Sequence, residues 1–89
     1  MEKLSYAPSG PNHFIPDIAI LDPNLTISLP PEITAHTSID AFTHGIESYC
    51  SSLNNALTNS YSVAGAKLII ENLEEVIASP SNIIAREKL

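Results

Sequence analysis

The chain has 89 residues, of which 44% are hydrophobic, and a formal net charge of −6. A chain of this length forms one domain at most and buries only a small core. The acidic excess excludes an assembled basic patch, so neither nucleic acid nor an anionic membrane is an expected partner. Cys50 is the only cysteine, which excludes an intrachain disulfide and favours a reducing compartment. The N-terminus has no signal-peptide pattern, so we expect a cytoplasmic protein.

The first part of the chain predicts a lead-in and one strand. Residues 1–16 are rich in turn-forming residues, which predicts an irregular segment. Residues 17–22 form a short apolar run between two prolines, which is typical of a strand buried on both faces. No second strand is predicted after it. This strand would therefore need pairing partners from outside the chain or from another copy of it.

A connector and a long helix are expected next. Pro30 and Pro31 suit the first turn of a helix, because that turn needs no N–H donors. The helix is predicted from about Pro31 to Ser52. Thr37 and Ser38 mark a candidate break, since two residues able to cap a helix stand side by side there.

Two further helices follow in the prediction. After a loop at residues 53–55, a second helix is expected from Thr58 or Asn59 to about Ala78. Ser81 or Asn82 can cap a third helix that reaches residue 88. The apolar residues of the second helix predict a stripe that faces the core: Val63, Ala66, Ile70, Leu73 and Ile77.

These elements predict a mainly α fold with one short N-terminal strand followed by two to three helices. Cys50, at the inner side of the first helix, is interpreted as a small core residue rather than a nucleophile.

The first helix also carries the candidate ligands of a metal. Asp40 and His44 stand four residues apart, so both project from one helical face, with Glu47 a further turn along. A carboxylate and an imidazole on one face can chelate a divalent transition metal. The same spacing also occurs in weak ion pairs on solvated helices. Gly45 costs about 1 kcal/mol inside a helix relative to alanine, which close approach of another backbone or of a ligand would explain.

The chain resembles a segment of the iron-dependent (group III) alcohol dehydrogenases. The similarity runs from about Pro16 to Leu89 and is carried by four blocks in order, at residues 19–26, 29–31, 40–49 and 85–88. The resemblance implies a fragment of the two-domain dehydroquinate synthase-like fold, in which an α/β domain binds NAD(P) and a helical domain binds the metal. On that pattern, residues 17–30 connect to the missing nucleotide-binding domain, and residues 31–89 are the first helices of an incomplete metal-binding domain.

The resemblance also implies a site. The family holds Fe(II), in some members zinc, with one Asp and three His. Asp40 matches the Asp ligand and His44 the first His ligand, whereas the other two lie further along the family's sequence. Glu47 would either hydrogen-bond to a ligand or be an ordinary helix-surface residue. Leu25 resembles a residue that lines the nicotinamide pocket, with a core anchor as the alternative.

Two functions of different class follow from this pattern. In the first, the chain is part of an NAD(P)-linked dehydrogenase acting on a small alcohol or aldehyde. The isolated chain is then expected to be inactive, since it lacks a Gly-rich phosphate-binding turn and has only two metal ligands. In the second, it is a non-catalytic helical module that self-associates, or binds a full-length homologue, through its unpaired strand and its exposed stripe.

Overall fold

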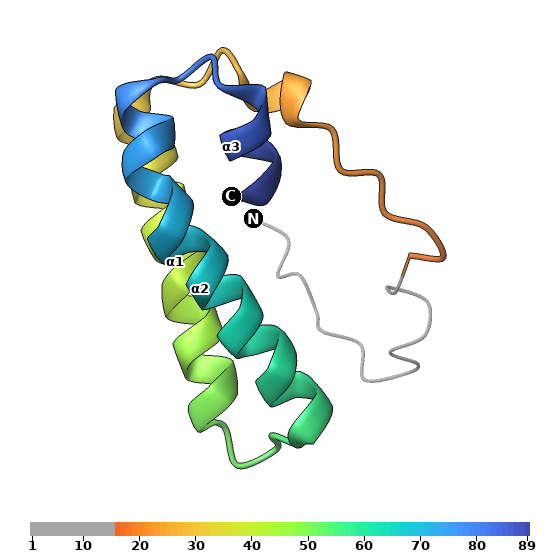
Figure 1. Ribbon diagram of the computed structural model, residues 1–89. Coiled ribbons are helices and arrows are strands. Elements are labelled where there is room, and N and C mark those ends of the chain that lie inside the picture. The colour runs from red at the N-terminus through yellow and green to blue at the C-terminus, as the bar shows by residue number, and fades with distance from the viewer. Residues whose placement is uncertain (1–15) are drawn as a thin grey trace, which may run out of the picture.

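A computed structural model describes residues 16–89 of the chain. It contains a short 3₁₀ helix, η2 (Pro23–Thr26), and three α-helices: α1 (Pro31–Cys50), α2 (Ala56–Ala78) and α3 (Ile83–Lys88). Figure 1 shows that α1 and α2 form an antiparallel hairpin and that α3 turns back beside its open end, next to η2. The predicted lead-in lies outside the described residues except for Pro16.

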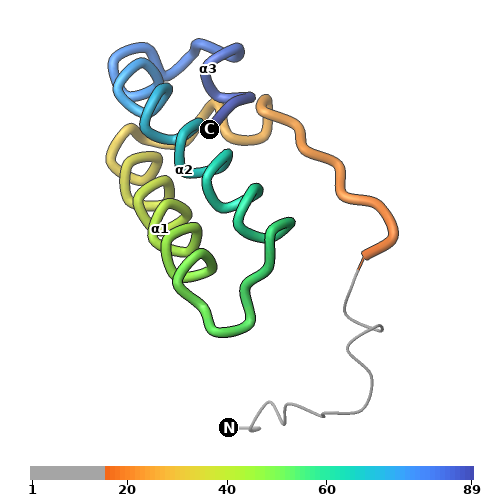
Figure 2. The backbone as a smooth tube through the Cα atoms, turned by 60° about the horizontal axis from the view of Figure 1, so that its bottom comes forward, coloured from red at the N-terminus to blue at the C-terminus, as the bar shows by residue number. Residues whose placement is uncertain are grey.

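The predicted strand is wrong. Residues 17–22 are irregular, and the described part of the chain contains no strand. Ile18, Ile20 and Leu21 are 80%, 86% and 91% exposed. Figure 2 shows this segment leading away from the helices. With no neighbouring strand to pair with, its backbone N–H and C=O groups are left to water, and the apolar run has no sheet to join.

The helix α1 begins at Pro31 as predicted and runs to Cys50 without a break. The Thr37 and Ser38 hydroxyls donate to carbonyls one turn back, at 2.9 Å to Ile33 and 2.7 Å to Thr34. Both side chains therefore bond within the helix instead of capping a new one. Cys50 is exposed at the C-terminal end of the helix, so its assignment to the core is wrong.

Asparagine side chains set the start of the next two helices. The Asn55 side chain accepts from the backbone N–H groups of Leu57 and Thr58 at 3.0 Å, and the Thr58 hydroxyl accepts from the Asn55 N–H at 2.9 Å. This reciprocal capping box starts α2 at Ala56, earlier than predicted. Asn82 caps α3, which confirms one of the two predicted caps.

The core is small and lies where the three α-helices meet. Its buried apolar side chains are Ile69, Val76 and Ala85, and only Val76 is fully buried. The predicted stripe on α2 is right only in part. Ala66 and Leu73 are half-buried, but Val63, Ile70 and Ile77 are 56%, 67% and 39% exposed. The buried apolar side chains of the helix are Ile69 and Val76, each one residue before a predicted one, so the core side of the helix is rotated from the prediction. The helix carries apolar residues on two adjacent faces. The face that contains Ile69 and Val76 packs on α1 and α3, and the face that contains Ile70 and Ile77 is exposed. Within residues 16–89, every helix is either too short or too polar to span a bilayer.

Candidate functional site

The helix α1 brings Asp40 and His44 together on one exposed face. The Asp40 Oδ2 atom lies 3.4 Å from His44 Nε2, and the two side chains are 73% and 70% exposed. Neither side chain makes a hydrogen bond among the described residues. Their lone pairs are therefore free to turn from this weak contact toward a shared cation.

The described residues supply only two ligands at this place. No group of three or more His, Cys, Asp or Glu side chains converges anywhere in residues 16–89. Glu47 and His36 are both exposed on α1, one on either side of the pair along the helix. Since a structural or catalytic transition-metal site needs at least three protein ligands, the pair fits a metal as one part of a site that other groups complete.

Leu25 lies in η2, away from the α1 pair in sequence and on a separate element. Its side chain is 79% exposed, so it is not a core anchor in the described part of the molecule. The turn is held by Asp22, whose side chain accepts from the Asn24 side chain and backbone N–H, both at 2.9 Å. These two bonds, with the side-chain bond the larger cause, lower the pKa of Asp22 below its ordinary value.

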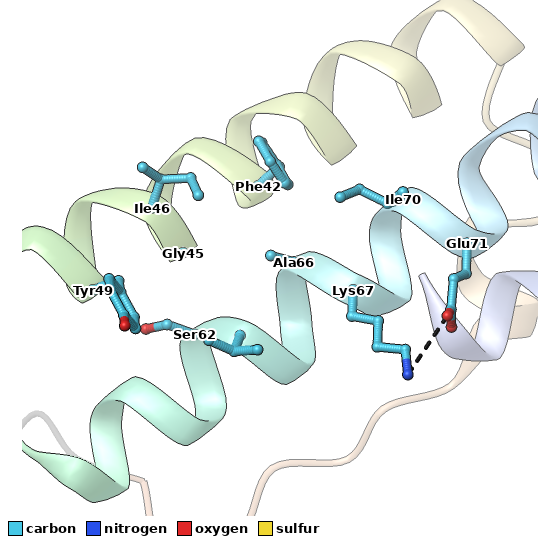
Figure 3. Close-up of a pocket in the computed structure, with 10 residues that line it drawn as sticks. Phe42, Gly45, Ile46, Tyr49, Ser62, Ala66, Lys67, Ile70 and Glu71 are labelled. Carbon is cyan, nitrogen blue, oxygen red and sulfur yellow. Dashed lines mark ion pairs between the residues drawn. The ribbon is translucent and has the colours of Figure 1, made fainter.

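A groove between α1 and α2 lies away from the Asp40 and His44 pair. It has a volume of about 460 Å³. It is lined by Phe42, Ile46 and Tyr49 of α1 and by Ala66 and Ile70 of α2, and Figure 3 shows these residues on the two neighbouring helices. Residues two apart on a helix point to nearly opposite sides, so the groove and the candidate ligands occupy different sides of α1. Sequence analysis missed the groove, whose only sequence signal is small residues set among bulky ones.

Gly45 lies on the side of α1 that faces α2, and its nearest neighbour outside its own helix is the backbone of Ser62. A Cβ atom at this position would lie 3.5 Å from the backbone oxygen of Ser62, an ordinary van der Waals distance. An alanine would therefore fit, and packing between the described helices does not by itself require glycine.

The C-terminal family model of the Fe-containing alcohol dehydrogenases matches residues 34–89. The chain is 40% identical over 75 residues to long-chain-alcohol dehydrogenase 1 of Geobacillus thermodenitrificans, covering 84% of this chain and 19% of that protein. It is 39% identical over 75 residues to 1,3-propanediol dehydrogenase of Klebsiella pneumoniae, with the same two coverages. Sulfoacetaldehyde reductase of Bilophila wadsworthia is 37% identical over 73 residues, which are 82% of this chain and 19% of that protein.

The chain thus spans about a fifth of the length of the curated relatives that it matches. No solved structure gives a significant match.

Proposed function

The chain belongs to the Fe-containing alcohol dehydrogenase family, and on this premise we propose that it supplies two metal ligands, Asp40 and His44, to a metal-dependent, NAD(P)-linked alcohol dehydrogenase. The observation that carries the proposal is the exposed pair on α1, whose carboxylate and imidazole lie 3.4 Å apart within the residues that the family model matches. The reaction class is hydride transfer between an alcohol or aldehyde and the nicotinamide cofactor.

The two side chains have distinct parts in this proposal. A bound Fe(II) or Zn²⁺ supplies Lewis-acid stabilisation of negative charge on the substrate oxygen. Asp40 contributes a negative charge that offsets part of the charge of the cation. His44 contributes a neutral imidazole nitrogen as the second ligand. Because both groups stand on one helical turn, α1 sets their separation before any cation arrives.

A chimera tests the proposal. The aligned segment of Klebsiella pneumoniae 1,3-propanediol dehydrogenase is replaced by that of this chain, and the metal content and alcohol oxidation of the purified protein are measured. Asp40→Ala and His44→Ala are expected to lower both. His36→Ala is the matched control, since His36 is an exposed histidine of the same helix, and it should leave both unchanged. A His44→Ala chimera that retains its metal and activity would contradict the proposal.

The 89-residue chain alone is expected to have no dehydrogenase activity and to bind metal weakly, because the described residues gather only two ligands. Titration of the chain with Zn²⁺ by calorimetry measures the second point. Tight binding that survives Asp40→Ala would place the metal elsewhere.

Two further residues have roles that the chimera separates. If Glu47 hydrogen-bonds to a ligand, Glu47→Gln lowers metal affinity by roughly 10- to 100-fold. If it is an ordinary surface residue, the substitution changes nothing. If Leu25 lines the nicotinamide pocket, Leu25→Ala raises the KM of the chimera for NAD(P) and leaves its metal content unchanged.

Self-association is the second candidate function. The strand that was expected to mediate it is absent from the described residues, but Ile46, Tyr49 and Ile70 remain about half exposed or more along the groove. Apolar patches of this kind mark contact surfaces. Sedimentation of the 89-residue chain tests this candidate: a stable oligomer that Ile70→Glu disperses would support it, and a monomer would exclude it. A cytoplasmic location remains a prediction.

A further inference from the structure

Arg86 is a buried charged residue for which the described part of the chain offers no carboxylate partner. Its side chain in α3 is only 7% exposed. The ion pairs within residues 16–89 involve other residues, His44 with Asp40 and Lys67 with Glu71. Taking a guanidinium out of water without a counter-ion costs several kcal/mol unless hydrogen bonds replace its hydration. Its hydrogen bonds therefore indicate what the side chain does.

All three nitrogens of the guanidinium donate to neutral oxygens on different segments. The Nε–H donates to the carbonyl of Pro80, in the turn between α2 and α3. One terminal nitrogen donates to the Thr34 hydroxyl at 3.5 Å and the other to the Leu29 carbonyl at 3.4 Å. Thr34 stands in the first turn of α1. Leu29 lies in the segment before that helix, residues 23–30, which contains η2 and is called the connector below. The planar fork of arginine suits such divergent acceptors, whereas a lysine ammonium is a single point.

These bonds join segments that are distant in sequence. Arg86 is 57 residues from Leu29 and 52 from Thr34. The connector has few other attachments, because η2 packs on α3 and on no other described helix, and none of its residues is buried. The connector runs into α1 through Pro30 and Pro31. Beyond that covalent link, the hydrogen bonds of Arg86 in α3 are the main tie that fixes the connector relative to α1.

We infer that Arg86 is a positioning residue, which holds the connector that carries Leu25 at a set distance from the helix that carries Asp40 and His44. The inference rests on the proposed function for its consequence, since a cofactor-side residue and the metal ligands must keep one separation for hydride transfer. The tie itself is a property of the chain and is measured without any activity.

Cys50 makes the measurement direct, because it is the only cysteine and is exposed at the end of α1. A second spin label is attached at Leu25→Cys, and the distance distribution between the two labels is recorded by pulsed electron paramagnetic resonance on the 89-residue chain. A reference pair, Cys50 with Glu74→Cys on α2, reports the α1 and α2 hairpin alone.

With Arg86 present, the distribution between positions 25 and 50 is expected to be narrow. Arg86→Gln should widen it about twofold or more, because the connector is then free to swing about its junction with α1, while the reference pair is unchanged. Lys88→Gln is the matched control, an exposed cation of the same helix, and should change neither pair. A narrow distribution in Arg86→Gln would overturn the inference, whatever the chimera shows about metal binding.

If Arg86→Gln also widens the distance distribution of the reference pair, the α1 and α2 hairpin itself has loosened. The variant Arg86→Lys then decides whether Arg86 has a separate positioning role. Lysine keeps the charge and the apolar stem but cannot reach three divergent oxygens. Widening of the connector distance alone in Arg86→Lys supports the positioning role. An unchanged distance in this variant overturns it.

Discussion

The same substitution, isoleucine to alanine, at two adjacent positions of α2 tests which face of this helix packs in the core. Ile69 is 6% exposed and Ile70 is 67% exposed. Truncating a buried isoleucine to alanine costs roughly 2–5 kcal/mol, so Ile69→Ala is expected to lower the free energy of unfolding by about 3 kcal/mol. Ile70→Ala removes side-chain surface that is mostly in water already, and should cost about 1 kcal/mol or less. The gain in helix propensity is the same at both positions and cancels in the comparison.

Urea denaturation of the 89-residue chain, followed by far-UV circular dichroism, measures the two losses. The urea midpoint of Ile69→Ala should be lower than that of Ile70→Ala. The m-values of the two variants should be equal, because both unfold from the same structure. Hydrogen exchange of the α2 amides gives the same comparison if the urea transition is broad. A larger loss at Ile70 would mean that α2 is rotated by about 100°, so that the predicted stripe faces the core. An equal loss would mean that the two side chains are equally buried, which would also refute the packing described above.

Three further substitutions test local features. Gly45→Ala should raise the free energy of unfolding by up to about 1 kcal/mol in urea denaturation, because the added Cβ finds its nearest neighbour at 3.5 Å; a loss of stability would mean closer packing. Asn55→Ala removes the cap of α2 and should lower the free energy of unfolding by about 1 kcal/mol, measured by thermal denaturation. The Asp22 pKa is lowered on folding, so its stabilisation of η2 is present above the ordinary pKa of 3.8 and is lost as pH falls through the folded value. By NMR, the Asn24 amide shift should titrate with a midpoint below 3.8 and should not titrate in Asp22→Asn.

The helix boundaries that were predictable from the sequence are those set by local chemistry. Pro31 at the start of α1 and Asn82 before α3 act through their own backbone and that of the next turn, so a few residues of sequence contain the whole cause. Thr37 and Ser38 show the limit of this reasoning. A hydroxyl that can cap a helix can also donate to a carbonyl inside one, and both side chains do the latter here.

The packing of α2 was not predictable in the same way. The helix has pairs of adjacent apolar residues, such as Ile69 with Ile70 and Val76 with Ile77, so two stripes of helical spacing run side by side. Periodicity alone gives both stripes equal weight. The choice between them depends on where α1 and α3 lie, and no segment of α2 contains that information. The strand prediction at residues 17–22 was wrong for a related reason, because an apolar run forms a strand only where a sheet receives it.

The contact between the candidate ligands is set by local sequence, whereas the contacts of Arg86 are set by tertiary packing. Asp40 and His44 are brought together by the pitch of one helix, so their contact follows from a spacing of four residues, and it is present at 3.4 Å. Arg86 meets Leu29 and Thr34 only because α3 turns back beside the open end of the hairpin, next to η2. The ligand pair and the groove also leave two different sides of α1 exposed while α2 packs on a third. A helix with half-exposed aromatic residues on one open side and candidate ligands on another is suited to contact further protein on both. The proposed metal site would need such contact on the ligand side, because two ligands are too few to hold the cation.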